Sequence, residues 1–135
     1  MLFRIVFISL LLLMLAACSQ DPPGVTLESG SYSVRISSDP DPLEVGERAQ
    51  FTLQVRDREN AAVGDCNVRL LQTMPGMEMS TDDVYVVLTP TGSGRYQGTS
   101  HEFHMGGDWV LEFELACGGE EARTLTLERH LEWPE

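Results

Sequence analysis

The chain has 135 residues, of which 21 are acidic and nine basic, with a formal net charge of −12. Nucleic acid and anionic lipid headgroups repel such a charge, so it suits a cationic partner or, more commonly, simply keeps a surface solvated. The length is sufficient for one domain of ordinary size.

The N-terminal segment, residues 1–17, is predicted to be a lipoprotein signal peptide. Arg4 supplies a positive charge, and the following apolar run of thirteen residues is typical of a signal peptide and too short for a membrane-spanning helix. The run ends in LAAC, which resembles the lipobox of bacterial lipoproteins. This resemblance implies that Cys18 is acylated and anchors the protein to a bacterial membrane, on the periplasmic or outer-surface side. The alternative is an ordinary secretory signal with a chance cysteine.

Cleavage before Cys18 leaves a mature chain with eight arginines, no lysine and 21 acidic residues, a net charge of −13. Residues 18–29 are rich in Pro, Ser and Gly and are predicted to be a flexible tether. The globular domain is expected to occupy residues 30–135.

Apolar residues alternate with polar ones through most of the predicted domain, which indicates β-strands that each bury one face. The clearest case is WVLEFELAC, in which Trp109, Leu111, Phe113, Leu115 and Cys117 share one face. No segment has a helical period. In chain order, the predicted strands are 31–37, 50–56, 66–72, 84–89, 95–103, 109–117 and 123–129. About seven short strands predict an antiparallel β-sandwich of immunoglobulin type.

Two cysteines, Cys66 and Cys117, remain in the domain, and outside the cytoplasm such a pair is most often a disulfide. If consecutive strands alternate in direction, Cys66 begins one strand and Cys117 ends another at the same pole of the sandwich. We expect an inter-sheet disulfide that closes a loop of roughly fifty residues and contributes about 4 kcal/mol.

The same alternation brings two methionine-containing loops together at the opposite pole. The loop after the strand at 66–72 contains MPGMEM, and the loop before Trp109 contains HMGGD. Together they hold every methionine of the mature chain. With the histidines on the second loop and on the strand before it, the candidate metal ligands are Met74, Met77, Met79, His101, His104 and Met105.

The Pro-Gly pair in MPGM predicts a type II turn, which brings the Cα atoms of Met74 and Met77 within roughly 7 Å. Thioether sulfur is neutral and polarizable, so it favours Cu(I) over Mg²⁺ or Ca²⁺. Methionine also escapes the oxidation to disulfide that removes thiolate ligands outside the cytoplasm. The expected cofactor is therefore copper, as Cu(I).

MPGMEM, followed by FHMGGDW, resembles the motifs of the YtkA-like domain family, which is related to FixH-type proteins. The resemblance extends from about Gly30 to Leu127. It implies a membrane-attached immunoglobulin-like domain involved in copper handling or respiratory oxidase assembly, with a copper donor or acceptor protein as partner. The family histidine after the second methionine of the first motif is absent, and Glu78 and Met79 stand there. The family positions present are Met74, Pro75, Gly76, Met77, Met105, Gly107 and Trp109.

Two other interpretations remain open. Methionine is adaptable packing material, so the cluster can instead fill the end of the sandwich, and Trp109 is expected in the core. An exposed methionine-rich pole can also serve a protein-binding or assembly module without metal. An enzyme is not expected, because the sequence lacks a nucleophile–base arrangement, a phosphate loop and an open zinc triad.

Overall fold

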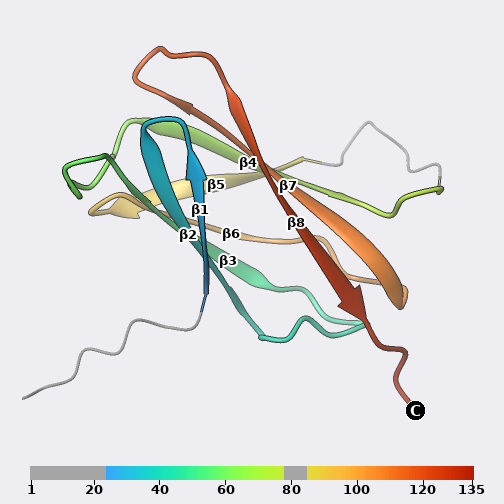
Figure 1. Cartoon of the computed structure of the whole chain (residues 1–135). Helices are drawn as coiled ribbons and strands as arrows, with labels where there is room; N and C mark the ends of the chain where they lie inside the picture. Colours follow the sequence, from blue (N-terminus) through green and yellow to red (C-terminus); the bar gives the residue numbers. More distant parts are fainter. Residues whose placement is uncertain (1–23, 78–84) are drawn as a thin grey trace, which may run out of the picture.

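The computed structural model describes residues 24–77 and 85–135. Within these ranges it contains eight β-strands and no helix (Figure 1). The strands are β1 (Val25–Ser29), β2 (Tyr32–Asp39), β3 (Gln50–Arg56), β4 (Cys66–Thr73), β5 (Tyr85–Gly92), β6 (Arg95–Thr99), β7 (Gly107–Cys117) and β8 (Arg123–Leu131). The described residues therefore include no helix that could cross a membrane.

The strands are antiparallel throughout and follow the order β1-β2-β3-β6-β5-β4-β7-β8. One layer contains β1, β2, β3 and β6, and the other contains β4, β7 and β8. Strand β5 connects the two layers, since its first half pairs with β4 and its second half pairs with β6. A register shift between Pro90 and Gly92 accompanies this change of partner. The predicted immunoglobulin-like antiparallel β-sandwich is confirmed.

The predicted alternation places the core between the layers. Phe51, Leu53 and Val55 of β3 are buried, and so is every second residue of β7 from Trp109 to Cys117. Phe51 and Phe113 meet edge to face across the layers, with ring centroids 5.5 Å apart. The polar residues between them point outward, as a period of two requires.

The N-terminal boundary of the domain was predicted too late in the chain. Residues 25–29, expected in the tether, form β1, which pairs with β2 from Val25↔Ile36 to Ser29↔Tyr32. The described part of the sandwich therefore has eight strands, one more than predicted. Strand β1 is short and contains only two apolar residues, Val25 and Leu27, which are half-buried, so it gives little signal in the sequence. The signal peptide and Cys18 lie outside the described residues.

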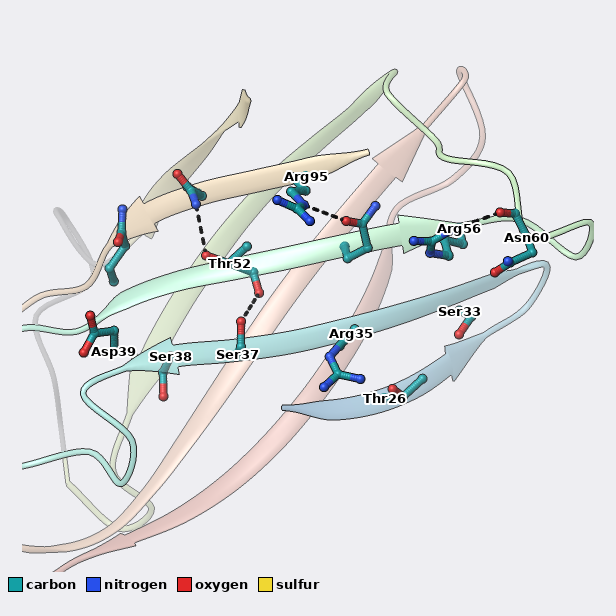
Figure 2. A pocket seen from close by; sticks show the side chains of 13 residues that line it. Thr26, Ser33, Arg35, Ser37, Ser38, Asp39, Thr52, Arg56, Asn60 and Arg95 are labelled. Carbon is teal, nitrogen blue, oxygen red and sulfur yellow. Dashed lines mark hydrogen bonds between the residues drawn. The ribbon is translucent and has the colours of Figure 1, made fainter. Parts of the chain in front are cut away.

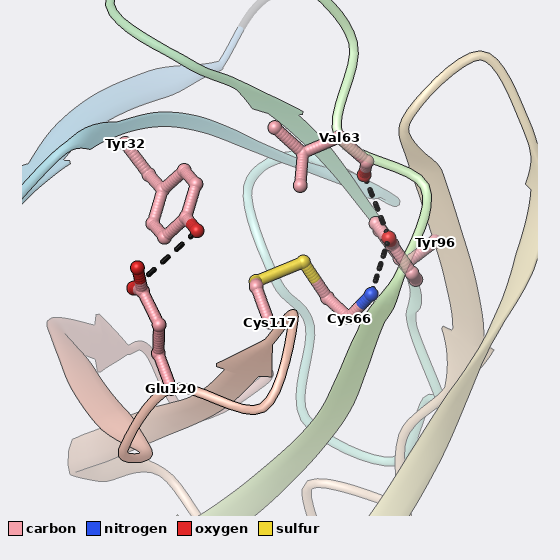
Figure 3. Close-up of a disulfide and its surroundings, with 6 residues drawn as sticks. All are labelled: Tyr32, Val63, Cys66, Tyr96, Cys117 and Glu120. Atoms are coloured by element: carbon pink, nitrogen blue, oxygen red, sulfur yellow. Dashed lines mark hydrogen bonds between the residues drawn. A yellow bond between two sulfur atoms is a disulfide. The ribbon is translucent and has the colours of Figure 1, made fainter.

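Cys66 and Cys117 form the predicted disulfide, with an S–S distance of 2.05 Å (Figure 3). The expectation that it joins two sheets was wrong, because the cysteines face each other on the neighbouring strands β4 and β7 of one layer. Their Cα atoms are 3.9 Å apart, closer than the usual range for disulfides. Beside the bridge, the buried Tyr96 hydroxyl donates to the carbonyl of Val63 (2.7 Å) and accepts from the amide of Cys66 (3.0 Å).

Candidate functional site

The pairing of β4 with β7 brings the two methionine-containing loops to one end of the sandwich. Thr73, the last residue of β4, faces Val110 near the start of β7, while the disulfide closes the other end of the same pair. The predicted arrangement of the two poles is therefore confirmed. We call the residues Met74, Met77, His104, Met105 and Trp109 the methionine pole.

The loop after β4 begins with the predicted turn. The amide of Met77 donates to the carbonyl of Met74 at 3.2 Å, and Gly76 has a φ of 80°. That positive φ at the third position is the mark of a type II turn, and glycine adopts it without steric cost. Glu78 and Met79 follow outside the described residues, so the structure says nothing about Met79 as a ligand.

The three described methionines differ in exposure. Met74 is only 9% exposed and belongs to the core, whereas Met77 is 49% exposed. Met105 is half-buried and packs against the core. The methyl carbon Cε of Met74 lies 3.2 Å from the position that a Cβ on Gly107 would occupy, so the first loop reaches the start of β7. Packing in the core therefore explains why a methionine stands at position 74 and partly explains Met105. It gives no reason for a methionine at position 77.

Trp109 is the centre of this end of the core, as predicted. It is 1% exposed, and its indole N–H donates to the carbonyl of Met105 at 3.0 Å. The rings of Phe103 and His104 meet it edge to face, with centroids 5.1 Å and 5.6 Å away. Because this hydrogen bond and these ring contacts hold the loop before β7, they position His104 and Met105 together.

His101 is held through its main chain. The buried side chain of Gln72 accepts from the amide of His101 at 2.8 Å and donates to its carbonyl at 3.2 Å. The residue itself is exposed, as is His104. The predicted strand 95–103 ends at Thr99, so His101 lies two residues after β6. The hydrogen bonds hold its backbone there, and the residue stays accessible to solvent. Sequence analysis did not identify Gln72. A polar residue in phase with the inward-facing residues of β4 was the feature that could have indicated a buried hydrogen-bonding role.

A histidine that the sequence left without a partner has one in the structure. His130 Nδ1 lies 2.7 Å from a carboxylate oxygen of Asp108, its cross-strand neighbour, and Nε2 lies 3.4 Å from Glu132. The hydrogen bond to Asp108 raises the pKa of His130 above its ordinary value.

Trp133 is 60% exposed and lies close beside Gly106. A Cβ on Gly106 would come within 2.7 Å of the Trp133 ring.

The donor atoms of the pole suit a soft ion better than a hard one. Among residues 24–77 and 85–135, no three His, Cys, Asp or Glu side chains are grouped to hold a metal ion. The disulfide removes Cys66 and Cys117 as thiolates. The remaining donors are neutral thioethers and the imidazole of His104, which are ligands that Cu(I) accepts and that Mg²⁺ and Ca²⁺ do not prefer.

Comparison with known proteins gives a family and a fold. A sequence model described as YtkA-like matches residues 26–114. A search of curated proteins found no match. The soluble domain of PmoD from Methylocystis sp. ATCC 49242 (Rockwell) is similar in structure, with a TM-score of 0.53 and 11% identity over 79% of this chain and 97% of that one.

A DUF4785 family protein from Legionella pneumophila subsp. pneumophila str. Philadelphia 1 has a TM-score of 0.49 and 18% identity over 76% of this chain. The chain spans 29% of that protein's length. At 11% identity, the likeness to the PmoD domain concerns the fold alone. The family match and the disulfide are in keeping with an extracytoplasmic domain.

Proposed function

Because the chain belongs to the YtkA-like family, we propose that it is an extracytoplasmic Cu(I)-binding domain that serves metal handling or respiratory oxidase assembly. The observation that carries the proposal is the pairing of β4 with β7, which brings both methionine motifs to one end of the sandwich. The half-exposed Met77 adds support, since packing gives no reason for an apolar side chain there.

Met105 and His104 would hold the ion from the second loop, and Met77 from the first. Met74 lies beside Gly107 and supports the site from the core side. Met79 and His101 complete the proposed ligand set. A single thioether is a weak ligand, so affinity depends on several of them acting together.

We also propose that residues 1–17 are removed and that an acylated Cys18 anchors the protein to the membrane. The first described strand begins at Val25, only a few residues after Cys18. A lipid anchor there would keep the domain close to the membrane surface. The disulfide supports an oxidising compartment. We propose a binding domain, not an enzyme, whose partner is a protein that donates or accepts copper.

Titration of the full chain with Cu(I), in non-ionic detergent and against a competing chelator, tests the proposal. Met77→Leu and Met105→Leu remove the sulfur and keep an apolar side chain of similar size. Each should weaken Cu(I) binding, and the double variant should nearly abolish it. Mg²⁺ and Ca²⁺ should not compete.

The matched control is Leu70→Met, which adds a thioether to β4 away from the pole, at a fully buried position. It should leave binding unchanged. If the parent protein fails to bind Cu(I), or if the double variant binds as tightly as the parent, the methionines are packing residues and the proposal is wrong.

A second candidate function is a metal-independent assembly module. It is favoured by two exposed apolar side chains at this end of the domain, Met77 at 49% and Trp133 at 60% exposure. Flexible methionines suit adaptable protein surfaces. In crosslinking of whole cells, Trp133→Ala should then lose a protein partner, and the Leu variants should keep it. Under the copper proposal, Trp133→Ala should keep the partner, and the Leu variants should lose it.

A further inference from the structure

A polar groove of about 570 Å³ lies on the outer face of the layer formed by β1, β2, β3 and β6 (Figure 2). Except for Ser38, the lining residues on β2 and β3 alternate with the core residues Val34, Ile36, Leu53 and Val55, so they point away from the core. The lining has no aromatic or aliphatic side chain. It consists of Thr26, Ser33, Arg35, Ser37, Ser38, Asp39, Gln50, Thr52, Gln54, Arg56, Asn60, Arg95 and Gln97.

The strand register brings three arginines to one part of this groove. Arg35, Gln54 and Arg95 are direct cross-strand neighbours in one row across β2, β3 and β6. The Cα atoms of Arg35 and Arg95 are therefore roughly 10 Å apart, two strand spacings. Arg56 follows Gln54 on the same face of β3, two residues further along. Arg56 and Arg95 lie on the neighbouring strands β3 and β6, within reach of one small ligand. The side chain of Arg35 extends toward Gly24 at the start of β1, where its Nε lies 3.4 Å from the position of a Cβ on Gly24.

The rest of the groove carries neutral hydrogen-bonding groups and one carboxylate. The next row contains Ser37, Thr52 and Gln97, and the amide of Gln97 donates to the hydroxyl of Thr52 at 3.3 Å. Asp39 lies at the end of the groove opposite Arg56 (Figure 2). The groove therefore changes from positive, through neutral and hydroxyl-rich, to negative.

This local positive charge stands against the charge of the whole molecule. The groove collects three of the eight arginines of a mature chain with a net charge of −13. Arg95 donates from Nε to the side-chain oxygen of Gln54 at 3.0 Å, and Arg56 donates to the carbonyl of Asn60 at 3.3 Å. Both acceptors are neutral, and the ion pairs found in the described part of the chain involve neither arginine.

We propose that this groove is a binding site for a small hydroxylated anion, such as a sugar phosphate or sugar acid. The guanidinium groups of Arg56 and Arg95 would bind the phosphate or carboxylate, for which their planar donor geometry is suited. The hydroxyl and amide groups of Ser37, Thr52 and Gln97 would bind the ligand's hydroxyls. Asp39 would accept a hydrogen bond from the far end of the ligand.

The proposal does not depend on copper. The groove lies on the outer face of β1, β2, β3 and β6, whereas the methionine pole lies at the end of the β4–β7 pair. None of its lining residues belongs to the methionine pole. A failure of Cu(I) binding would leave this site unaffected.

The test is calorimetric titration of the full chain, in non-ionic detergent, with glucose 6-phosphate and with glucuronate. Glucose is the uncharged control. We expect saturable binding of one or both anions, weakened by added salt, and no binding of glucose. Arg95→Gln and Arg56→Gln should each weaken binding by about tenfold or more, since each removes hydrogen bonds between charged groups.

Arg69→Gln is the matched control, because it removes the same charge from an exposed residue of β4 in the other layer. It should leave anion binding unchanged. An equal loss in Arg69→Gln would mean that overall charge is responsible and would overturn the proposal. Circular dichroism of each variant checks that the sandwich is intact.

Phosphate can also come from a lipid headgroup, and a second arm of the test separates the two sources. Vesicles containing phosphatidylglycerol are compared with vesicles of phosphatidylcholine alone. Binding to the anionic vesicles that is lost in Arg95→Gln, without binding of the soluble anions, assigns the same site to a headgroup. Absence of binding in both arms refutes the proposal.

Discussion

The methyl carbon of Met74 lies 3.2 Å from the point where a side chain on Gly107 would begin, so the first methionine loop packs directly on the start of β7. Gly107 also has a φ of 121°, which L side chains rarely adopt. The contact explains why a glycine stands here, between Met105 and Trp109: the backbone must turn sharply and approach a core methionine closely.

Gly107→Ala should therefore destabilise the fold by about 1–3 kcal/mol, since it adds both backbone strain and a tight contact with Met74. Urea unfolding followed by tryptophan fluorescence measures the change. Gly64→Ala is the control, because that glycine has neither a positive φ nor a neighbour within 4 Å of the added Cβ. Equal stability of Gly107→Ala and the parent protein would contradict the expectation.

Removing the disulfide should lower the free energy of unfolding by about 4 kcal/mol, because the bridge closes a loop across a sequence separation of 51 residues. The double variant Cys66→Ala/Cys117→Ala tests this by chemical denaturation. Mass spectrometry of the parent protein should find no free thiol at these two positions. Two free thiols in the oxidised protein would be the contrary result.

Tyr96→Phe should cost about 1–3 kcal/mol, since it leaves the buried amide of Cys66 and the carbonyl of Val63 without the hydroxyl that joins them. Tyr32→Phe is the matched control. The hydroxyl of Tyr32 makes an exposed hydrogen bond to Glu120 at 3.4 Å (Figure 3), so its removal should change stability little. Thermal unfolding of both variants gives the comparison, and similar losses would argue against the role of Tyr96.

The pairing of His130 with Asp108 predicts a pH dependence. Because the pKa of His130 is raised in the folded protein, the stabilisation is fully present below about pH 6.5 and is lost as the pH rises through the folded pKa. An NMR titration of the ring should give a lower pKa in Asp108→Asn than in the parent. Glu132→Gln, whose carboxylate is more distant at 3.4 Å, should have the smaller effect. An unchanged pKa in Asp108→Asn would show that the contact does not form in solution.

Lipid anchoring can be tested separately from the fold. If the LAAC sequence is a lipobox, Cys18→Ser should release the protein from the membrane or leave it unprocessed with its signal peptide attached. Cell fractionation and mass spectrometry of the N-terminus distinguish these results from those of the parent. Normal processing together with normal membrane association would mean that Cys18 is not lipidated.

Local patterns in the sequence were enough for most of the fold. A strand with one buried face must alternate, so seven strands, the β5–β6 turn and the type II turn at Met74–Met77 were predicted close to their observed places. Strand β1 was missed because an edge strand with half-buried residues needs little apolar content. The methionine motifs were likewise visible as residues, and alternating strand direction placed them at one pole.

Only the tertiary structure decided which strands pair and how deeply each side chain is buried. Register is a relation between distant segments, so the sequence did not reveal that Cys66 faces Cys117 within one layer, or that Asp108 meets His130. The same holds for the row of Arg35, Gln54 and Arg95, whose members are ordinary polar residues until three strands align them. The sequence by itself determined which donor atoms the proposed copper site can use. Tertiary packing, including the approach of Met74 to Gly107, decided that Met74 is buried and that Met77 is half exposed.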